Sequence, residues 1–164
     1  GAAMPGIAAN PFRRPAGTRF PTLKLPGSPM SADSQALIAS YYAAFNRRDW
    51  EGFLDLLTDD VAHDINQGGR ETGRDAFRAF LARMDRCYAE QIKDIVILVN
   101  ADGSRAAAEF TVHGTYKQAD EGLPAAHGQS YVLPAGAFFE IRGGRVARIS
   151  NYYNLQDWLR QVGG

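Results

Sequence analysis

Hydrophobic positions along the chain change their period near residue 90. Before that point they recur at the three- and four-residue spacing of amphipathic helices, and after it they alternate as in half-buried strands. A helical period returns only in the last ten residues. The pattern predicts helices over about 31–45, 50–57, 73–88 and 155–162, a short strand around Asp64, and strands over about 92–100, 105–116, 130–141 and 145–154.

The connections between these segments carry turn residues. Asp102-Gly103 is typical of a hairpin, Gly143-Gly144 of a second tight turn, and the polar stretch 117–128 of a loop. Ser31 or Asp33 can cap the first helix. Because helices come first and a meander of strands follows, we predict an α+β fold with a mixed or antiparallel sheet wrapped around N-terminal helices.

Composition divides the 164 residues into two parts. Residues 1–30 hold six of the eight prolines, four basic side chains and no acid, which predicts an extended arm, a leader or an expression remnant. The folded domain is then 31–164. Since the whole chain has a formal net charge of zero, this domain has a net charge of −4, which argues against nucleic-acid binding.

Two further features concern the surroundings of the protein. No apolar run approaches the length of a membrane span, so we expect no membrane partner. Cys87 is the only cysteine, which rules out an intramolecular disulfide and fits a reducing compartment such as the cytoplasm.

The stretch DDVAHDINQGGRETG, residues 59–73, places a carboxylate on the short strand. Alternation puts Val61, His63 and Ile65 on one side and Asp64 and Asn66 on the other. A carboxylate among amphipathic helices must be hydrogen-bonded, exposed at a rim, or held at raised pKa in a pocket. The third alternative is how proton-shuttling sites are made.

Polar side chains on the later strands extend this candidate pocket. Glu109, Thr111 and His113 share one side of their strand, and Asn151 and Tyr153 share one side of the last strand. If these sides face the interior, an apolar cavity gathers a few polar groups, the usual form of a small-molecule site. The predicted lining is Trp50, Phe77, Tyr41, Asp64, Asn66, Glu109, Thr111, His113, Asn151 and Tyr153.

For several of these residues a structural role is an open alternative. Asp64 can be a rim carboxylate or a cap, and Tyr41 a packed helix aromatic. His113 can be satisfied by a neighbouring acid, and Glu109 can pair with an arginine. His63, which points away from Asp64, is expected to be structural.

The order of elements resembles the cone-shaped, cystatin-like fold of the nuclear transport factor 2-like superfamily. Local sequence over about 34–162 resembles its SnoaL-like and ketosteroid-isomerase-related members, through the segments YYAAFNRRDWEGFLDLLTDDVAHD, GRDAFRAFL, EFTVHGTY and FFEIRGGRVARISNYYNLQDW. The resemblance implies a small hydrophobic ligand inside the cone and a homodimer formed through the open face of the sheet. It names no activity, because the superfamily includes isomerases, cyclases, hydrolases and binding domains.

The resemblance also implies roles for particular residues. Asp64 falls where ketosteroid isomerases place their general base, and Tyr41 where they place an oxyanion-hole tyrosine. The second oxyanion-hole acid is missing, because Gly136 or Ala137 stands near its expected position. The Arg and Asp residues of the superfamily's epoxide hydrolases are also missing, at Thr111, His113 and Asn151.

These observations favour a cofactor-independent isomerase, cyclase or lyase acting on a small hydrophobic carbonyl compound. Asp64 would move the proton, and Tyr41 or His113 would stabilise the oxyanion. No metal is expected, because the three histidines show no ligand spacing. The alternatives are a non-catalytic ligand-binding domain and a dimerisation module whose cavity is filled.

Overall fold

The computed structural model describes residues 29–163. The predicted arm therefore lies outside the described residues, apart from its last two positions, which begin the first helix. Ser31 and Asp33 lie inside that helix, so the prediction that either one caps it is wrong. No helix of the described part is both long and apolar enough to span a membrane. The helices are α1 (Pro29–Arg47), α2 (Trp50–Asp55), α3 (Arg74–Cys87) and α4 (Leu155–Val162).

The strands form one six-stranded sheet in the order β2-β1-β6-β5-β4-β3. β1 and β6 are parallel, and the other neighbours are antiparallel. The three-residue β2 was not predicted, and it pairs with β1 at one edge. The strands are β1 (Leu57–Asp64), β2 (Arg70–Thr72), β3 (Tyr88–Val99), β4 (Arg105–Tyr116), β5 (Gln129–Arg142) and β6 (Arg145–Tyr153).

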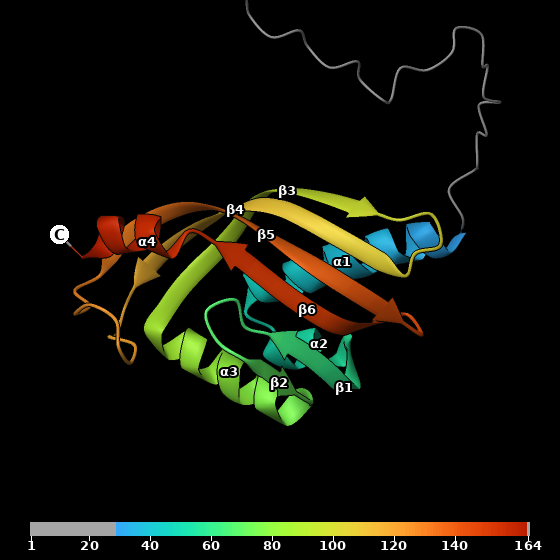
Figure 1. The fold of residues 1–164 in the computed structure, drawn as a ribbon, viewed down its shortest axis with the longest axis horizontal. Coiled ribbons are helices and arrows are strands. Elements are labelled where there is room, and N and C mark those ends of the chain that lie inside the picture. Colours follow the sequence, from blue (N-terminus) through green and yellow to red (C-terminus); the bar gives the residue numbers. More distant parts are fainter. Residues whose placement is uncertain (1–28, 164) are drawn as a thin grey trace, which may run out of the picture.

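The sheet curves around the N-terminal helices without closing (Figure 1). α1 lies against the concave inner face, where Ile38 and Tyr42 are buried, while α2 and α3 lie at the open side. α4 follows β6 and packs beside β5 at one end of the sheet, where Trp158 is buried. This architecture confirms the predicted α+β fold and leaves space between the inner face and α3.

The direction of the β4 side chains corrects one prediction. Phe110 and Val112 are buried on the inner face. Alternation therefore turns Glu109, Thr111 and His113 to the outer face, opposite to what was predicted. The walls of the cone are themselves apolar, so the apolar side of this strand faces inward and the polar side faces outward.

A register shift in β3 decides which of its side chains face inward. Between Lys93 and Val96 the pairing with β4 shifts, and Asp94 adopts a φ of 55°. A bulge exchanges the two faces of a strand. Before the shift Glu90 and Ile92 face inward, and after it Ile97 packs against the core while Val96 is exposed. The shift thereby directs an acid into the cone while keeping the far half of β3 apolar inside.

Candidate functional site

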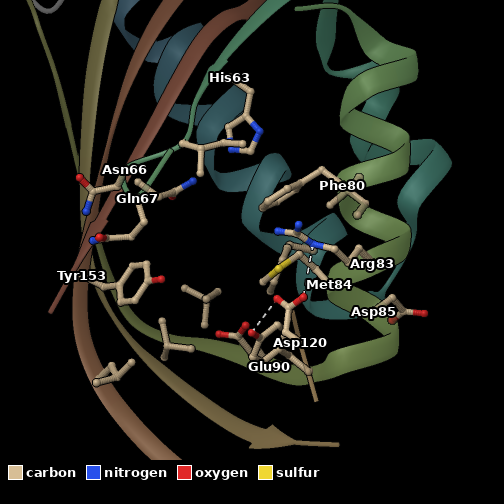
Figure 2. A pocket seen from close by; sticks show the side chains of 18 of the residues that line it. His63, Asn66, Gln67, Phe80, Arg83, Met84, Asp85, Glu90, Asp120 and Tyr153 are labelled. Atoms are coloured by element: carbon tan, nitrogen blue, oxygen red, sulfur yellow. Dashed lines mark hydrogen bonds and ion pairs between the residues drawn. The ribbon is translucent and has the colours of Figure 1, made fainter. Parts of the chain in front are cut away.

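A cavity of about 550 Å³ lies between the inner face of the sheet and α3. Aromatic and aliphatic side chains form most of its wall, and polar groups gather toward its two ends (Figure 2). His63 lies at one end, and Glu90 and Asp120 lie at the other. This is the form expected of a small-molecule site, and its volume lies within the usual range. The alternative of a module with a filled cavity is therefore wrong.

Seven of the predicted residues do line this cavity. They are Tyr41, Trp50, Asp64, Asn66, Phe77, Asn151 and Tyr153. Their contacts with a ligand stay predictions. Glu109, Thr111 and His113 are absent from the lining because they lie on the outer face, so their predicted place in the pocket is wrong.

Asp64 reaches the cavity rim, but its carboxylate is held by two arginines. Arg70 donates to it from Nε at 2.6 Å and from Nη2 at 2.9 Å, and Arg148 Nη1 lies 3.6 Å away. The hydrogen bonds from Arg70 are the main reason that the pKa of Asp64 lies below its ordinary value. Of the three alternatives for this carboxylate, the raised pKa in a pocket is therefore wrong, and the hydrogen-bonded carboxylate is the one found. Asp64 is a charged partner in a network and is poorly suited to exchanging a proton near neutral pH.

This pairing belongs to a row of charges that crosses the sheet. Arg148 also contacts Glu140, with Nε 3.1 Å from Oε1, and Arg105 contacts Glu140 at 3.4 Å. The row runs through Arg105, Glu140, Arg148, Asp64 and Arg70, with alternating signs and one residue from each of β4, β5, β6, β1 and β2. Neighbouring strands place opposite charges side by side, which is the cross-strand pairing that stabilises sheets.

Tyr41, the predicted partner of Asp64, is part of the aromatic core. Its ring lies 4.3 Å from that of Phe53 and 5.3 Å from that of Phe139, measured between ring centroids. Burial raises its pKa well above the ordinary range, so the hydroxyl stays protonated. In the part of the chain that the structure describes, no hydrogen bond joins Tyr41 to Asp64.

Glu90 is the acid that the cavity isolates. It projects from β3 among aromatic side chains, and burial raises its pKa from 4.5 to about 7. The nearby hydroxyl of Tyr131 offsets part of that rise in pKa. Within residues 29–163, no cation contributes to the pKa of Glu90. Glu90 can therefore hold or release a proton near neutral pH, as an acid–base group must.

Gly114 explains how Tyr131 reaches Glu90. In the sheet, Gly114 on β4 pairs with Glu90 on one side and with Tyr131 on the other. A Cβ atom at Gly114 would overlap the ring and hydroxyl of Tyr131. The absence of a side chain lets the ring lie across β4, so that two residues on strands that are not neighbours can meet.

A second acid lies beside Glu90 but comes from the loop after β4. Tyr88 donates a hydrogen bond of 2.9 Å to the Asp120 carboxylate, and Arg83 Nε lies 3.8 Å from it. The loop is tied down by Tyr116, whose hydroxyl donates to Pro124 O at 2.7 Å and accepts from the Asp120 N–H at 2.9 Å. Asp120 is thus held in place and paired with Arg83, whereas Glu90, at the same end of the cavity, is paired with no cation of the described chain.

Tyr153 completes this end of the cavity from β6. Figure 2 shows its ring reaching in from the strand opposite Asp120 and Glu90. Burial, and then the nearness of these two acids, raises its pKa, so its hydroxyl stays protonated. It is available to donate a hydrogen bond to an oxygen of a bound molecule.

His63 lines the other end, although it was expected to be structural. It is only 3% exposed, and burial lowers its pKa from 6.5 to about 4. The imidazole is therefore neutral at physiological pH. In the described chain, no group of three or more His, Cys, Asp and Glu side chains is arranged to hold a metal ion.

The sequence contained a signal for some of the residues that were missed, but not for Asp120. Tyr88, Glu90 and Ile92 alternate on one side of a strand, but this segment was assigned partly to the preceding helix. Asp120 lies in a loop, where alternation gives no direction. His63 was placed on the correct side of β1, together with Val61, but only the opposite side, with Asp64 and Asn66, was expected to line the cavity.

Comparison with known proteins places this geometry in a family. The family model for the SnoaL-like domain matches residues 38–149. A protein from Pseudomonas putida, provisionally named a polyketide cyclase, is 61% identical, with 79% of this chain and 97% of that chain covered and a TM-score of 0.78. A protein of the same provisional name from Xanthomonas campestris is 54% identical, with 80% and 98% covered and a TM-score of 0.78.

More distant structures share the fold alone. An LEH-like epoxide hydrolase from M. tuberculosis is 17% identical, with 82% of this chain and 88% of that chain covered and a TM-score of 0.66. An NTF2-like protein from Burkholderia pseudomallei is 19% identical, with 80% and 98% covered and a TM-score of 0.68. No curated protein matches the chain. With most of its domain matched by the family model, the chain belongs to the SnoaL-like family.

Proposed function

We propose that this protein is a cofactor-independent enzyme of the isomerase or cyclase type, which moves a proton on a small, mostly apolar carbonyl compound. The observation that carries the proposal is Glu90, a carboxyl group without a cationic partner in an aromatic cavity, with its pKa raised to about 7. Perturbed acids of this kind concentrate at catalytic sites. The names given to the Pseudomonas and Xanthomonas proteins agree with this class of chemistry.

The proposed step is proton abstraction next to a carbonyl group. The Glu90 carboxylate takes the proton from the α-carbon, and the electrons of the broken C–H bond form the carbon–carbon double bond of an enolate. The negative charge develops on the carbonyl oxygen, where the Tyr153 hydroxyl donates a hydrogen bond. Glu90 then returns the proton to carbon. Asp64, Tyr41 and His113 have no part in this step.

Deuterium exchange tests this step without knowledge of the natural substrate. The probe is 2-tetralone, an apolar two-ring ketone, whose α-hydrogens are followed by NMR in deuterated buffer and corrected for exchange without protein. We expect the protein to accelerate exchange, with a rate that rises with pH through about 7 as Glu90 ionises. Glu90→Gln should lower that rate by at least about a hundredfold.

Asp64→Asn is the matched control, since it removes a carboxylate from the same cavity rim. It should change the exchange rate by less than about threefold, because Asp64 is held as a charged partner of Arg70. Equal loss in both variants would contradict the assignment to Glu90. Binding of 2-tetralone without any exchange would favour a non-catalytic ligand-binding domain.

We also propose that the protein is a homodimer formed through the outer face of the sheet. Val96, Leu98, Phe138 and Tyr152 are exposed there, and the rings of Phe138 and Tyr152 lie 5.5 Å apart. Strand pairing aligns Leu98 with Phe138 through one residue of β4. Contiguous apolar surface of this kind marks an interaction site. Phe110 and Val112 on β4 are buried on the inner face and take no part in this surface.

A further inference from the structure

The end of the cavity remote from Glu90 contains a buried polar atom, Nδ1 of His63, for which the described residues supply no hydrogen-bond partner. His63 projects from β1 between two aromatic residues of α3. Its ring is stacked on Phe77 with centroids 4.5 Å apart, and it meets Phe80 edge-on at the same distance. Figure 2 shows His63 at the opposite end of the cavity from Glu90, with Phe80 and Met84 between them.

Nothing in the described part of the chain exchanges a hydrogen bond with this Nδ1 atom, although it is buried. Leaving a buried polar atom unsatisfied costs about 1–3 kcal/mol, so folded proteins rarely do so without a reason. Stacking on Phe77 explains why an aromatic ring lies here, but it does not explain why the ring is an imidazole. The described residues leave the hydrogen-bonding capacity of its Nδ1 atom unused.

We infer that His63 is a specificity-determining residue, which hydrogen-bonds a second polar group of the ligand. The pocket then selects flat, apolar molecules that carry an oxygen function at each end. One oxygen lies near Glu90 and Tyr153, and the other lies near the imidazole. The inference rests on the proposed function only in placing the carbonyl oxygen at the Glu90 end.

The spacing of the two ends fits such a molecule. Phe77 stacks on His63, whereas Arg83, six residues along α3, contacts Asp120 at the other end. Six residues of helix extend about 9 Å, which is the scale of two fused six-membered rings with a substituent at each end. Phe80 and Met84 line the wall between the two ends (Figure 2).

The chemistry of the imidazole narrows the second group. Burial keeps His63 neutral, so it offers one N–H donor and one lone pair. A half-turn of the ring exchanges Nδ1 with a carbon, so either nitrogen can meet the ligand. A hydroxyl group can both donate and accept and therefore suits either tautomer. A ligand carboxylate is disfavoured, because it would add a negative charge to a cavity that already holds Glu90 and Asp120. Only one arginine, Arg83, contacts these two acids.

Binding measurements with matched ketones test this inference. Isothermal titration calorimetry at pH 7.5 compares 2-tetralone, 6-hydroxy-2-tetralone and 6-methoxy-2-tetralone, which differ only at the end remote from the carbonyl group. We expect the hydroxylated ketone to bind at least about tenfold more tightly than the other two, since a site built for a hydroxyl group rejects analogues without it. His63→Phe preserves the stacked ring and should abolish this preference.

Two further measurements keep the result decisive. Gln67→Met removes a different polar group from the same end of the cavity and should retain the preference. Circular dichroism checks that His63→Phe folds, and if it does not, His63→Leu replaces it. Equal affinities in the wild-type protein, a preference that survives in the histidine variant, or binding of none of the ketones would overturn the inference.

The outcome is separable from that of the proposed function. Loss of proton exchange in every experiment, with the hydroxyl preference intact, would remove the enzymatic proposal and leave the role of His63 standing. Exchange that depends on Glu90, with no hydroxyl preference, would do the reverse. Glu90→Gln should itself retain the preference, because it leaves the His63 end unchanged.

Discussion

The two faces of the sheet place their acids in opposite environments. Asp64, on the outer face at the end of β1, meets two arginines and belongs to a row of five alternating charges. Glu90, on the inner face of β3, meets aromatic rings and a tyrosine hydroxyl. The same functional group is thereby fixed as an anion in one place and left close to its titration point in the other.

This difference shows that nearness to a cavity is a poor guide to chemistry. Both carboxylates line the same pocket, but only the one without a cation can change its protonation state near neutral pH. Hydrogen bonds to the charged form lower a pKa, and desolvation raises it. The identity of the neighbours therefore separates a structural acid from a candidate catalyst.

The largest effect is expected on dimer formation, from a substitution on the outer face of the sheet. Phe138→Asp places a charge on the exposed apolar surface, and in a homodimer two such charges would be buried without partners. The dimer should weaken by at least about a thousandfold, as measured by sedimentation over a range of concentrations. Gln156→Asp, an exposed change on α4, is the control. A wild-type protein that is monomeric at micromolar concentration would contradict the interface.

The next effect concerns the stability of Glu90→Gln as a function of pH. Because folding raises the pKa of Glu90, its contribution to stability is fully present below about pH 4.5 and is lost as the pH rises through about 7. Glutamine does not ionise, so the variant should match the wild type at pH 4.5 and exceed its free energy of unfolding by about 3 kcal/mol at pH 8. Urea unfolding at several pH values measures this difference. A difference independent of pH would show that Glu90 is not desolvated.

A smaller loss, of folding stability, is expected when Gly114, which lets Tyr131 approach Glu90, is given a side chain. Gly114→Ala introduces a Cβ atom where the tyrosine ring now lies, so the ring or the strand must shift. Overpacking of this kind typically costs about 2 kcal/mol. Gly136→Ala is the matched control on the neighbouring strand, since its Cβ would meet only a backbone oxygen, at 3.2 Å. Thermal unfolding should separate the two variants, and an equal effect would argue against the close approach.

The fold could be predicted from the sequence because period and turn chemistry are local properties. The hairpin at Gly143-Gly144, where both residues have positive φ, and the helical entry at Gly73 were visible in the residues themselves. The short β2 was not, because its three exposed residues carry no pattern of their own. Its existence depends on pairing with β1.

The site was harder to predict because alternation defines two faces but not which one is inside. On β1 the two sides were assigned correctly, but only the polar side was expected at the cavity, so His63 was missed. On β4 the same choice misplaced His113. Here most of the cavity wall consists of apolar side chains. Its few polar groups include Glu90 near the start of β3, Asp120 in a loop, and His63 between aromatic rings. Glu90 depends further on the register shift in β3, which only pairing with β4 reveals.

The smallest effect, and the sharpest contrast with Glu90, is expected for the stability of Asp64→Asn. The carboxylate is about one-third exposed and its main partner, Arg70, more than half, so solvent screens their attraction. The variant should lose less than about 1 kcal/mol of unfolding free energy. Because folding lowers the pKa of Asp64, this contribution is present above about pH 4 and disappears as the pH falls below that value. The difference from the wild type should therefore stay constant between pH 5 and 8, where that of Glu90→Gln changes most, and 1 M salt should reduce it. Urea unfolding at low salt and at 1 M salt measures this difference in stability. A gain in stability of Asp64→Asn at pH 8 would show that Asp64 is also a desolvated acid.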